Sequence, residues 1–350
     1  MRERRAAPHT PEDAVRTYAA TRPQVERATR EYVELVTTLL DEAGINYLAV
    51  TGRAKSIESF AAKAGRTVDG KPVYSDPLTQ ITDQIGVRVV TYVLADVDAV
   101  ADVLADQLHV LDDRDMGLET AQAGGFGYRS RHVLVELDPD RAGREERAAL
   151  AGRTASVQVR TVLQHAWAEF EHDTRYKGTI PEEHAPDLDR RFTLAAGLLE
   201  LADREFLTIR DRLREGLPGA ADEPDEDPRI GAQDLAAFLA GRFPDAGWSR
   251  TDHYAWASAL LLELGITSLR ELGEVLSTVD TTALNARMDY RYPPGAVRRL
   301  DDALLAVHGE RYVELTGNAH RVTLLTARLA RMRHDETRRS ETRAASPRGE

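Results

Sequence analysis

The sequence predicts an α+β fold: a mixed β-sheet flanked by helices, followed by an all-helical domain. Short runs rich in Val and Ile alternate with helical periodicities along the N-terminal part of the chain. Residues 217–230 (LPGAADEPDEDPRI) are rich in Pro, Gly and acidic residues, which is typical of a linker. Beyond this stretch, residues 232–332 show several helical patterns and no clear strand pattern.

A long helix is expected to open the N-terminal region. Apolar residues recur at helical spacing from Val15 to Leu39, and Gly44 supplies a C-terminal stop. Strands are then expected at residues 45–53, 85–94, 127–138 and 156–161, with an extended segment at 109–113. Further helices are expected at residues 56–66 and 96–108, from about 162 onward, and at 186–213.

Domain boundaries follow from this order of elements. The mixed domain with its N-terminal helix is expected to span residues 1–215, the acidic linker 216–230 and the helical domain 231–332. The last segment, 333–350, is charged and rich in Ser and Arg, so we expect it to be disordered.

Composition excludes several classes of protein. The chain has 350 residues with 42% hydrophobic content, enough for a sizeable core, and no cysteine for disulfides or thiolate chemistry. The N-terminus MRERRAAPHT lacks the apolar stretch of a secretory signal, and no run approaches the ~20 apolar residues of a membrane helix. We therefore expect a cytoplasmic protein with no membrane contact.

The net charge of −12 disfavours non-specific binding of nucleic acid by the whole surface. It leaves room for a local basic pocket, and residues 52–66 (GRAKSIESFAAKAGR) suggest one. Arg53 and Lys55 end a predicted strand, and Ser59, Lys63 and Arg66 share one face of the following helix. Such a cationic wall beside a helix N-terminus suits a polyphosphate. The alternative is an ordinary solvated basic face.

The stretch 81–91 (ITDQIGVRVVT) places two charges on a strand that otherwise looks buried. Asp83 at its mouth is suited to hold Mg²⁺, which takes one or two carboxylates together with water and phosphate oxygens. Arg88 could reach a phosphate from the same sheet. The alternative is a buried Asp–Arg ion pair, which desolvation makes a poor source of stability.

The stretch 124–132 (GGFGYRSRH) begins with glycines that allow close backbone approach. On the alternating strand that follows, Tyr128 and His132 point to one face. Tyr128 is placed to stack on a base, a contact of about 1–3 kcal/mol. The alternative is a tyrosine that fills the core.

The stretch 156–177 (SVQVRTVLQHAWAEFEHDTRYK) combines a strand with a helix. Ser156, Gln158 and Arg160 share one face of the strand. The helix places three further polar residues on one side, at i, i+4 and i+7: His165, Glu169 and His172. The arrangement is not H-E-x-x-H, so a zinc protease is not indicated. The alternative for each histidine is a hydrogen-bonded structural role.

Taken in order, four motifs resemble the RelA/SpoT-type alarmone synthetase domain in its small form, over roughly residues 45–215. They are R-x-K-x-x-x-S-x-x-x-K-x-x-R from Arg53, D-x-x-G-x-R from Asp83, F-G-Y-R-S-x-H from Phe126, and Q-x-R-T…H-A-W-A-E-x-E-H…Y-K from Gln158. The resemblance implies a nucleotidyltransferase-like fold. It also implies transfer of the β,γ-pyrophosphate of ATP to the 3′-OH of GDP or GTP, giving ppGpp or pppGpp and AMP, with Mg²⁺ as cofactor.

The resemblance also implies roles for individual residues. Asp83 corresponds to the catalytic Mg²⁺ ligand. The ATP and phosphate contacts correspond to Arg53, Lys55, Ser59, Lys63, Arg66, Arg88 and His172. The guanine-nucleotide contacts correspond to Tyr128, His132, Gln158, Arg160 and His165.

The sequence departs from the family at a catalytic position. The usual motif is E-x-Q-x-R-T, and Ser156 stands where the acid is expected. A hydroxyl supplies neither negative charge nor a base at neutral pH. Glu136 on the neighbouring strand and Glu171 on the following helix are candidates to replace the acid. A lysine common shortly before the G-Y pair is also missing, and Gly124 and Gly125 occupy that stretch.

Alternatives follow from these departures. One alternative is a toxin-like relative that transfers pyrophosphate to tRNA 3′ ends. The negative net charge argues against tRNA binding. A group of C-terminal arginines argues for it: Arg328, Arg331, Arg333, Arg338 and Arg339. A catalytically impaired nucleotide-binding module, or a helical scaffold with a decayed enzyme domain, would follow from Ser156. Three roles stay open for residues 231–332: control of the enzyme, assembly of a homo-oligomer and binding of a partner protein.

Overall fold

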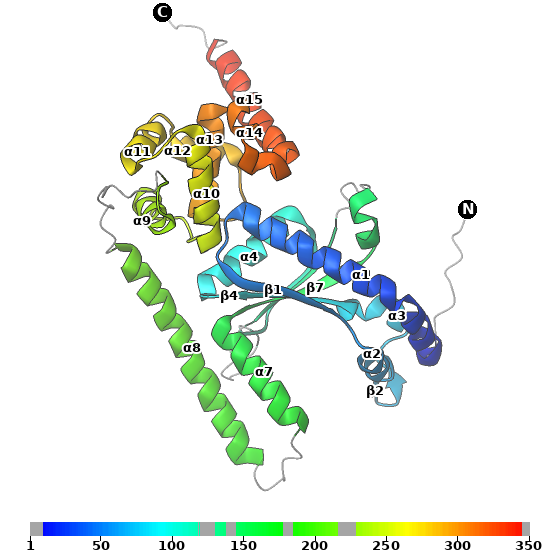
Figure 1. The fold of residues 1–350 in the computed structure, drawn as a ribbon. Coiled ribbons are helices and arrows are strands. Elements are labelled where there is room, and N and C mark those ends of the chain that lie inside the picture. Colours follow the sequence, from blue (N-terminus) through cyan, green and yellow to red (C-terminus); the bar gives the residue numbers. More distant parts are fainter. Residues whose placement is uncertain are drawn as a thin grey trace, which may run out of the picture. The chain divides into compact units, whose positions relative to one another are not determined.

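The computed structural model describes residues 10–117, 119, 130–137, 145–177, 185–215 and 229–344 (Figure 1). Two compact units make up the chain. The first comprises residues 1–39 and 47–207, and the second comprises residues 40–46 and 208–350. The segment 40–46 therefore belongs with the C-terminal helices although it lies near the N-terminus.

The first unit is built on a five-stranded sheet with the order β1-β4-β7-β6-β5. β4 and β7 are parallel and the other neighbouring pairs are antiparallel, which confirms the predicted mixed sheet. Its strands are β1 (Tyr47–Ala54), β4 (Ile85–Thr91), β5 (His109–Asp115), β6 (Arg131–Glu136) and β7 (Thr154–Thr161). A separate small hairpin consists of β2 (Thr67–Val68) and β3 (Lys71–Pro72).

The helices of this unit are α1 (Pro11–Ala43), α2 (Ile57–Ala64), α3 (Pro77–Gln80), α4 (Leu94–Gln107), α7 (Val162–Lys177) and α8 (Ala185–Glu215), with 3-10 turns η1 (Thr82–Gln84) and η2 (Glu145–Leu150). The C-terminal ends of α1, from residue 40, and of α8, from residue 208, belong to the second unit. The strand predicted over 85–94 ends at Thr91, and Leu94 already begins α4. Both segments are apolar and buried, so periodicity alone does not separate them. The strand predicted from 127 is described from 131, and most of the predicted linker lies outside the described residues.

The two faces of the sheet differ in chemistry. Val87, Val157 and Val133 are register neighbours on one face and are almost fully buried. α4 packs against β4, β5, β6 and β7, while α7 packs against β4 and β7. Figure 1 shows α1 and α4 on one side of the sheet and α7 on the other. The polar alternate residues therefore point to the side of α7.

Gly52→Ala is expected to destabilise the first unit by about 1–3 kcal/mol, because it overpacks the contact between β1 and α1. A Cβ at Gly52 would lie 2.5 Å from Val33 Cγ2 and 2.9 Å from Thr29 Cγ2, both on stiff β-branched side chains. Urea unfolding followed by circular dichroism measures the loss. Gly241→Ala is the control, since no described atom outside the backbone of its own helix lies within 4 Å of its added Cβ. Equal stability of Gly52→Ala and the parent would contradict this packing.

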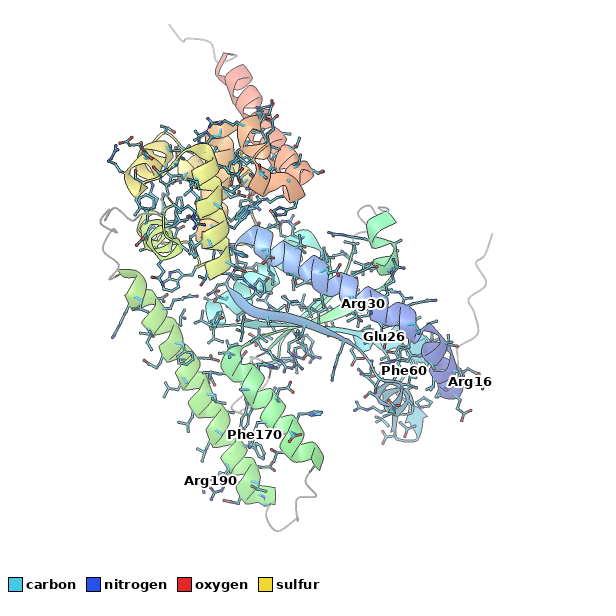
Figure 2. The ribbon with its side chains drawn as sticks, viewed as in Figure 1. Arg16, Glu26, Arg30, Phe60, Phe170 and Arg190 are labelled. Carbon is cyan, nitrogen blue, oxygen red and sulfur yellow. The ribbon has the colours of Figure 1, made fainter. Side chains whose placement is uncertain are left out.

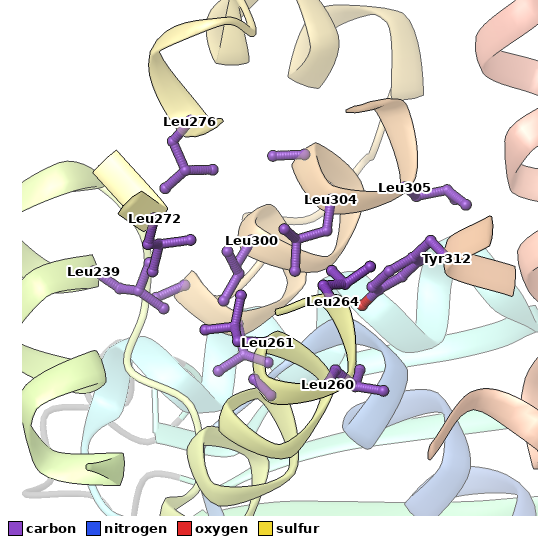
Figure 3. Packing of buried hydrophobic residues seen from close by; sticks show 14 of the residues in the cluster. Leu239, Leu260, Leu261, Leu264, Leu272, Leu276, Leu300, Leu304, Leu305 and Tyr312 are labelled. Atoms are coloured by element: carbon purple, nitrogen blue, oxygen red, sulfur yellow. The ribbon is translucent and has the colours of Figure 1, made fainter. Parts of the chain in front are cut away.

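The second unit is helical throughout its described part, as the sequence predicts. Its elements are α9 (Ala232–Arg242), α10 (Thr251–Leu264), α11 (Leu269–Ser277), α12 (Thr281–Met288), α13 (Ala296–His308), α14 (Glu310–Val313), η3 (Thr316–Arg321) and α15 (Val322–Ala344). A leucine-rich core joins α9, α10, α11 and α13 with Tyr312 of α14 (Figure 3). No helix in the described part of the chain is long and apolar enough to cross a membrane.

The tail prediction needs correction, because α15 continues as helix through Ala344. Arg, Glu and Ala are frequent in this stretch and favour helix, although its high charge suggested disorder. Arg328, counted above among the C-terminal arginines that could support tRNA binding, is only 4% exposed. Residues 345–350 lie outside the described residues.

Arg328 belongs to a buried charge network in the second unit. Its guanidinium contacts Asp302 and lies 2.6 Å from Asp301 Oδ2. Three buried arginines face three carboxylates: Arg298, Arg321 and Arg328 against Glu42, Asp301 and Asp302. Glu42 comes from the 40–46 segment, so this short piece of chain completes the neutralisation of the network.

Candidate functional site

A cleft of about 230 Å³ opens on the polar side of the sheet in the first unit. β1, η1, β4, β7 and α7 contribute to its walls. It is lined by Thr51, Gly52, Arg53, Lys55, Asp83, Gly86, Val87, Arg88, Ser156, Gln158 and Glu169. Three cations and two carboxylates therefore meet in one small cavity of a chain whose net charge is −12.

A row of polar residues crosses the sheet at the level of this cleft. The row follows from register, because residues paired across neighbouring strands point to the same face. Its members, in the order β1, β4, β7, β6 and β5, are Thr51, Arg88, Gln158, His132 and Arg114. Segments far apart in the sequence thus present their functional groups along one line.

Asp83 is held between two lysines. Lys55 Nζ lies 2.8 Å from Asp83 Oδ2, and Lys63 Nζ lies 3.0 Å from Asp83 Oδ1. The lysines come from the end of β1 and from α2. Tyr18 supports both elements, because its hydroxyl donates to Lys55 O at 2.6 Å and its ring stacks on Phe60 of α2 with centroids 4.2 Å apart.

The lysines also set the charge of Asp83. Partial burial alone would raise the pKa of this carboxyl, but hydrogen bonds and charge from Lys55 and Lys63 outweigh burial and hold the pKa below its usual range. Asp83 is therefore ionised at neutral pH. Its Oδ1 is buried and is held by the ion pair with Lys63, so a metal ion would take this oxygen in exchange for the lysine.

A single carboxylate of this kind fits Mg²⁺, which completes its shell with water and phosphate oxygens. The described residues contain no cluster of three or more His, Asp or Glu side chains able to cage a metal by themselves. Any metal held by Asp83 would thus need oxygens from a ligand.

Arg88 does not pair with Asp83, so the buried ion pair considered from the sequence is not formed. Arg88 Nη1 lies 2.8 Å from Glu169 Oε1 on α7. His165 Nδ1 lies 3.8 Å from the same oxygen. Burial and the Arg88 charge lower the pKa of His165, so it is neutral at pH 7.

α7 is anchored beside the cleft by aromatic packing. Trp167 lies 5.6 Å and Phe170 lies 6.2 Å from the ring centroid of Phe192 on α8. Figure 2 shows Phe170 on α7 beside α8. Glu169 itself is 58% exposed in its side chain and lines the cleft. The carboxylate can therefore change partners without moving the helix.

β7 supplies the floor next to Arg88. Ser156 and Gln158 line the cleft, and Arg160 Nη2 donates to Gln158 Oε1 at 2.8 Å. His132 lies beside Gln158 in register, and its Nε2 is 3.0 Å from Ser130 Oγ. Burial lowers the pKa of His132 and the Arg160 charge lowers it further, so this imidazole is neutral at pH 7.

Several residues expected at the site do not line the cleft. Ser59 lies in the first turn of α2, where its backbone N–H donates to Oγ of the N-cap residue Ser56 at 3.1 Å, and Arg66 is exposed after the end of that helix. Glu136 is the register partner of Thr154 on β7. Thr154 lies on the same face of the strand as Ser156 and is the neighbouring residue on that face, so Glu136 is not opposite Ser156. Glu171 and His172 are on α7 but not among the lining residues. Tyr128, Gly124 and Gly125 lie outside the described residues.

Among the charged residues that line the cleft, Glu169 is the one to which the sequence analysis assigned no role. Its spacing placed it on one helix face with His165 and His172, which was the available signal. Spacing could not indicate that this part of α7 covers the cleft or that Arg88 is its partner. Glu169, and not Glu136 or Glu171, is the second carboxylate of the cleft.

Comparison with known proteins identifies this region. Residues 52–180 match the family described as "Region found in RelA / SpoT proteins". GTP pyrophosphokinase YjbM of Bacillus subtilis (strain 168) is 31% identical over 170 residues, which cover 47% of this chain and 73% of the relative. GTP pyrophosphokinase YwaC of the same organism is 28% identical over 163 residues, 45% of this chain and 71% of the relative.

Solved structures of similar proteins cover a little over half of the chain. A GTP pyrophosphokinase family protein from Streptococcus pneumoniae is 27% identical with a TM-score of 0.45, covering 57% of this chain and 95% of its own. Small alarmone synthetase 1 from Bacillus subtilis bound to its product pppGpp is 23% identical with a TM-score of 0.43, covering 57% of this chain and 97% of its own.

Proposed function

Because the chain belongs to the RelA/SpoT family of GTP pyrophosphokinases, we propose that its cleft transfers the β,γ-pyrophosphate of ATP to the 3′-hydroxyl of GDP or GTP. The observation that supports this proposal best is the convergence of Arg53, Lys55, Arg88 and Asp83 in one cavity. The products are AMP and a guanosine nucleotide with a 3′-diphosphate.

The cations of the cleft bind the donor. ATP carries about four negative charges, so positioning its phosphates for attack requires offsetting charge at fixed points. Arg53 at the open side of β1 and Arg88 on the sheet floor are suited to grip phosphate oxygens. Lys55 and Lys63 keep Asp83 ionised. If a cation bridges Asp83 and a phosphate of ATP, both lysines lie close enough to contact the same phosphate.

Asp83 would hold Mg²⁺ together with phosphate oxygens of ATP. When bound, the metal neutralises phosphate charge and makes the β-phosphorus easier to attack. The acceptor nucleotide is placed along the polar row, where Gln158, Arg160 and the neutral His132 offer hydrogen bonds. Tyr128 stays the predicted partner of the guanine ring.

Glu169 is our candidate to remove the acceptor proton. Ser156 cannot do so at neutral pH, and Asp83 is occupied by two lysines. In the ligand-free cleft Glu169 is held by Arg88. A donor phosphate that binds Arg88 would free the carboxylate. The O3′–Pβ bond then forms, the bond from Pβ to the bridging oxygen of AMP breaks, and the 3′-OH proton passes to Glu169.

Label transfer from [γ-³²P]ATP tests the function. The purified protein is incubated with Mg²⁺ and GDP, GTP or bulk tRNA, and we expect label in a guanosine nucleotide. Arg53→Gln should lower kcat/KM for ATP by about 10–100-fold, because a charge-assisted phosphate contact contributes about 1.5–3 kcal/mol. Label in tRNA would show that the acceptor is tRNA and not a guanosine nucleotide. Binding of GDP without any label transfer would show that the protein binds nucleotides but does not catalyse the reaction.

A further inference from the structure

A second cavity lies within the helical unit, away from the residues assigned to pyrophosphate transfer. Its volume is about 460 Å³, a size typical of small-molecule sites. α12, α13, α14 and α15 contribute to its walls. The lining residues are Leu284, Arg287, Ala306, Val307, His308, Gly309, Glu310, Arg311, Leu329, Met332 and Arg333.

The floor of this cavity is apolar. Leu284, Leu329 and Met332 line it and are 3%, 7% and 4% exposed, so they belong to the core of the unit as well. Val307 at the wall is apolar and 39% exposed. A ligand that reaches this floor would need an apolar ring or chain, because a fully hydrated ion would gain nothing from these side chains.

The rim is cationic. Arg287, Arg311 and Arg333 come from three different helices, and Glu310 is the sole carboxylate among the lining residues. Arg333 Nη1 lies 3.0 Å from Glu310 Oε1, an exposed ion pair that exchanges readily with an anion. Guanidinium groups match the paired oxygens of a phosphate, so the surplus of arginine favours a phosphorylated ligand.

His308 adds a polar group inside the cavity. Its Nε2 is buried and has no hydrogen-bond partner among the described residues, which is unusual for a buried polar atom. Burial lowers the pKa of His308 and the charge of Arg311 lowers it further, so the imidazole is neutral at pH 7. Rotation of the imidazole, which is partly exposed, would bring this atom to a ligand oxygen or ring nitrogen.

We propose that the cavity between α12, α13, α14 and α15 binds a phosphorylated small molecule with an apolar ring, the chemistry of a nucleotide. The phosphates would lie at the arginine rim, the ring on the leucine and methionine floor, and a polar edge of the ring at His308. Among the described lining residues Glu310 is the one carboxylate and it is paired with Arg333, so the proposal is for a binding site. This inference does not depend on pyrophosphate transfer.

Methyl NMR of methionine tests the proposal in the full chain. The sequence has four methionines, of which Met332 lies on the cavity floor and Met116 follows β5 in the other unit. With ¹³C-methyl methionine, titration with ATP or GTP should shift the Met332 signal, which Met332→Leu assigns. Inorganic phosphate lacks the ring and the nucleosides lack the phosphates. Each should therefore need at least a 10-fold higher concentration than the nucleotide to shift the Met332 signal.

Variants separate this site from the cleft. Arg311→Gln combined with Arg333→Gln should weaken the nucleotide effect on Met332 by at least 10-fold, while Arg270→Gln, an exposed arginine of the same unit, should leave it unchanged. Arg53→Gln in the cleft should also leave it unchanged. Unperturbed circular dichroism shows that the variants fold. Absence of any Met332 shift at millimolar nucleotide, or an equal shift in the double variant, would overturn the proposal.

Discussion

Replacing Glu169 with Gln is expected to lower kcat by about 10²–10³-fold while tightening the binding of ATP. The loss of rate follows from removal of the proton acceptor, a contribution of this order for general bases. The gain in affinity follows from the Arg88–Glu169 contact of 2.8 Å, which ATP must break before its phosphate can use Arg88. An exposed pair contributes up to about 1 kcal/mol, so binding should tighten by up to about 5-fold.

The opposite direction of the two effects is the diagnostic result. kcat comes from the label-transfer assay, and affinity comes from calorimetry with a non-transferable ATP analogue, which does not need the reaction to occur. Asp173→Asn, the same kind of change four residues further along α7, is the control and should alter neither quantity. A Glu169→Gln variant that loses ATP affinity together with rate would show that Glu169 only maintains the shape of the cleft.

Ser156→Glu extends this test. Ser156 and Glu169 line the same cavity from β7 and α7, so a carboxylate at either position can serve the acceptor hydroxyl. Ser156→Glu in the Glu169→Gln background should restore at least 10-fold of the lost kcat, well within what a positioned base contributes. Failure of the rescue, combined with full activity of the parent, would place the base elsewhere in the site.

Asp301→Asn is expected to destabilise the helical unit by about 3–5 kcal/mol, because removing one partner of a buried charge cluster leaves the others uncompensated. Asp301 is 3% exposed. Its Oδ2 lies 2.5 Å from Arg321 Nη2 and 2.6 Å from Arg328 Nη1, and its Oδ1 accepts from Tyr312 at 2.5 Å. An amide in this place supplies no charge to two buried guanidiniums.

The same residue predicts a pH dependence. Burial opposes ionisation of Asp301, but Arg321 and Arg328 outweigh it and hold the pKa well below its usual range. A lowered folded pKa contributes stability that is fully present above the unfolded value of about 3.9 and is lost as the pH falls below it. The difference between the parent and Asp301→Asn should therefore be largest at neutral pH and shrink below about pH 4.

Urea unfolding followed by tryptophan fluorescence measures this loss, because Trp256 reports on the network through Arg321, whose guanidinium carbon lies 4.6 Å from its ring centroid. Asp252→Asn removes an exposed pair with Arg250 in the same unit and should cost less than about 1 kcal/mol. Similar losses for both variants, or a gap that stays constant down to pH 2, would contradict the role assigned to Asp301.

Local patterns predicted the kinds of elements well but not their arrangement. The alternation of apolar and polar residues placed four of the strands and the long helices close to their observed bounds. The parallel pairing of β4 with β7 depends on contacts between residues about 70 positions apart, such as Arg88 with Gln158, which no local pattern contains. The apolar run across Thr91–Leu94 also hid the boundary between strand and helix.

The site was predictable where the chemistry is local and not where it depends on packing. Arg53, Lys55, Asp83 and Arg88 were identified from motifs and all four line the cleft. The two lysine contacts of Asp83 and the pairing of Arg88 with Glu169 arise from the way α2 and α7 pack on the sheet. Spacing along the sequence does not show which elements pack together. It therefore favours Glu136 and Glu171 as substitutes for the missing acid, whereas Glu169 is the glutamate that lines the cleft.

The assignment of residues 40–46 to the helical unit bears on how this chain can be divided. The backbone enters that unit at Leu40, leaves it before Tyr47 and returns at Thr208. A C-terminal fragment cut at the acidic stretch would keep Arg298, Arg321 and Arg328 but lack Glu42, leaving an unbalanced positive charge in its interior. The two halves are therefore poor candidates for separate expression or for exchange as modules between proteins.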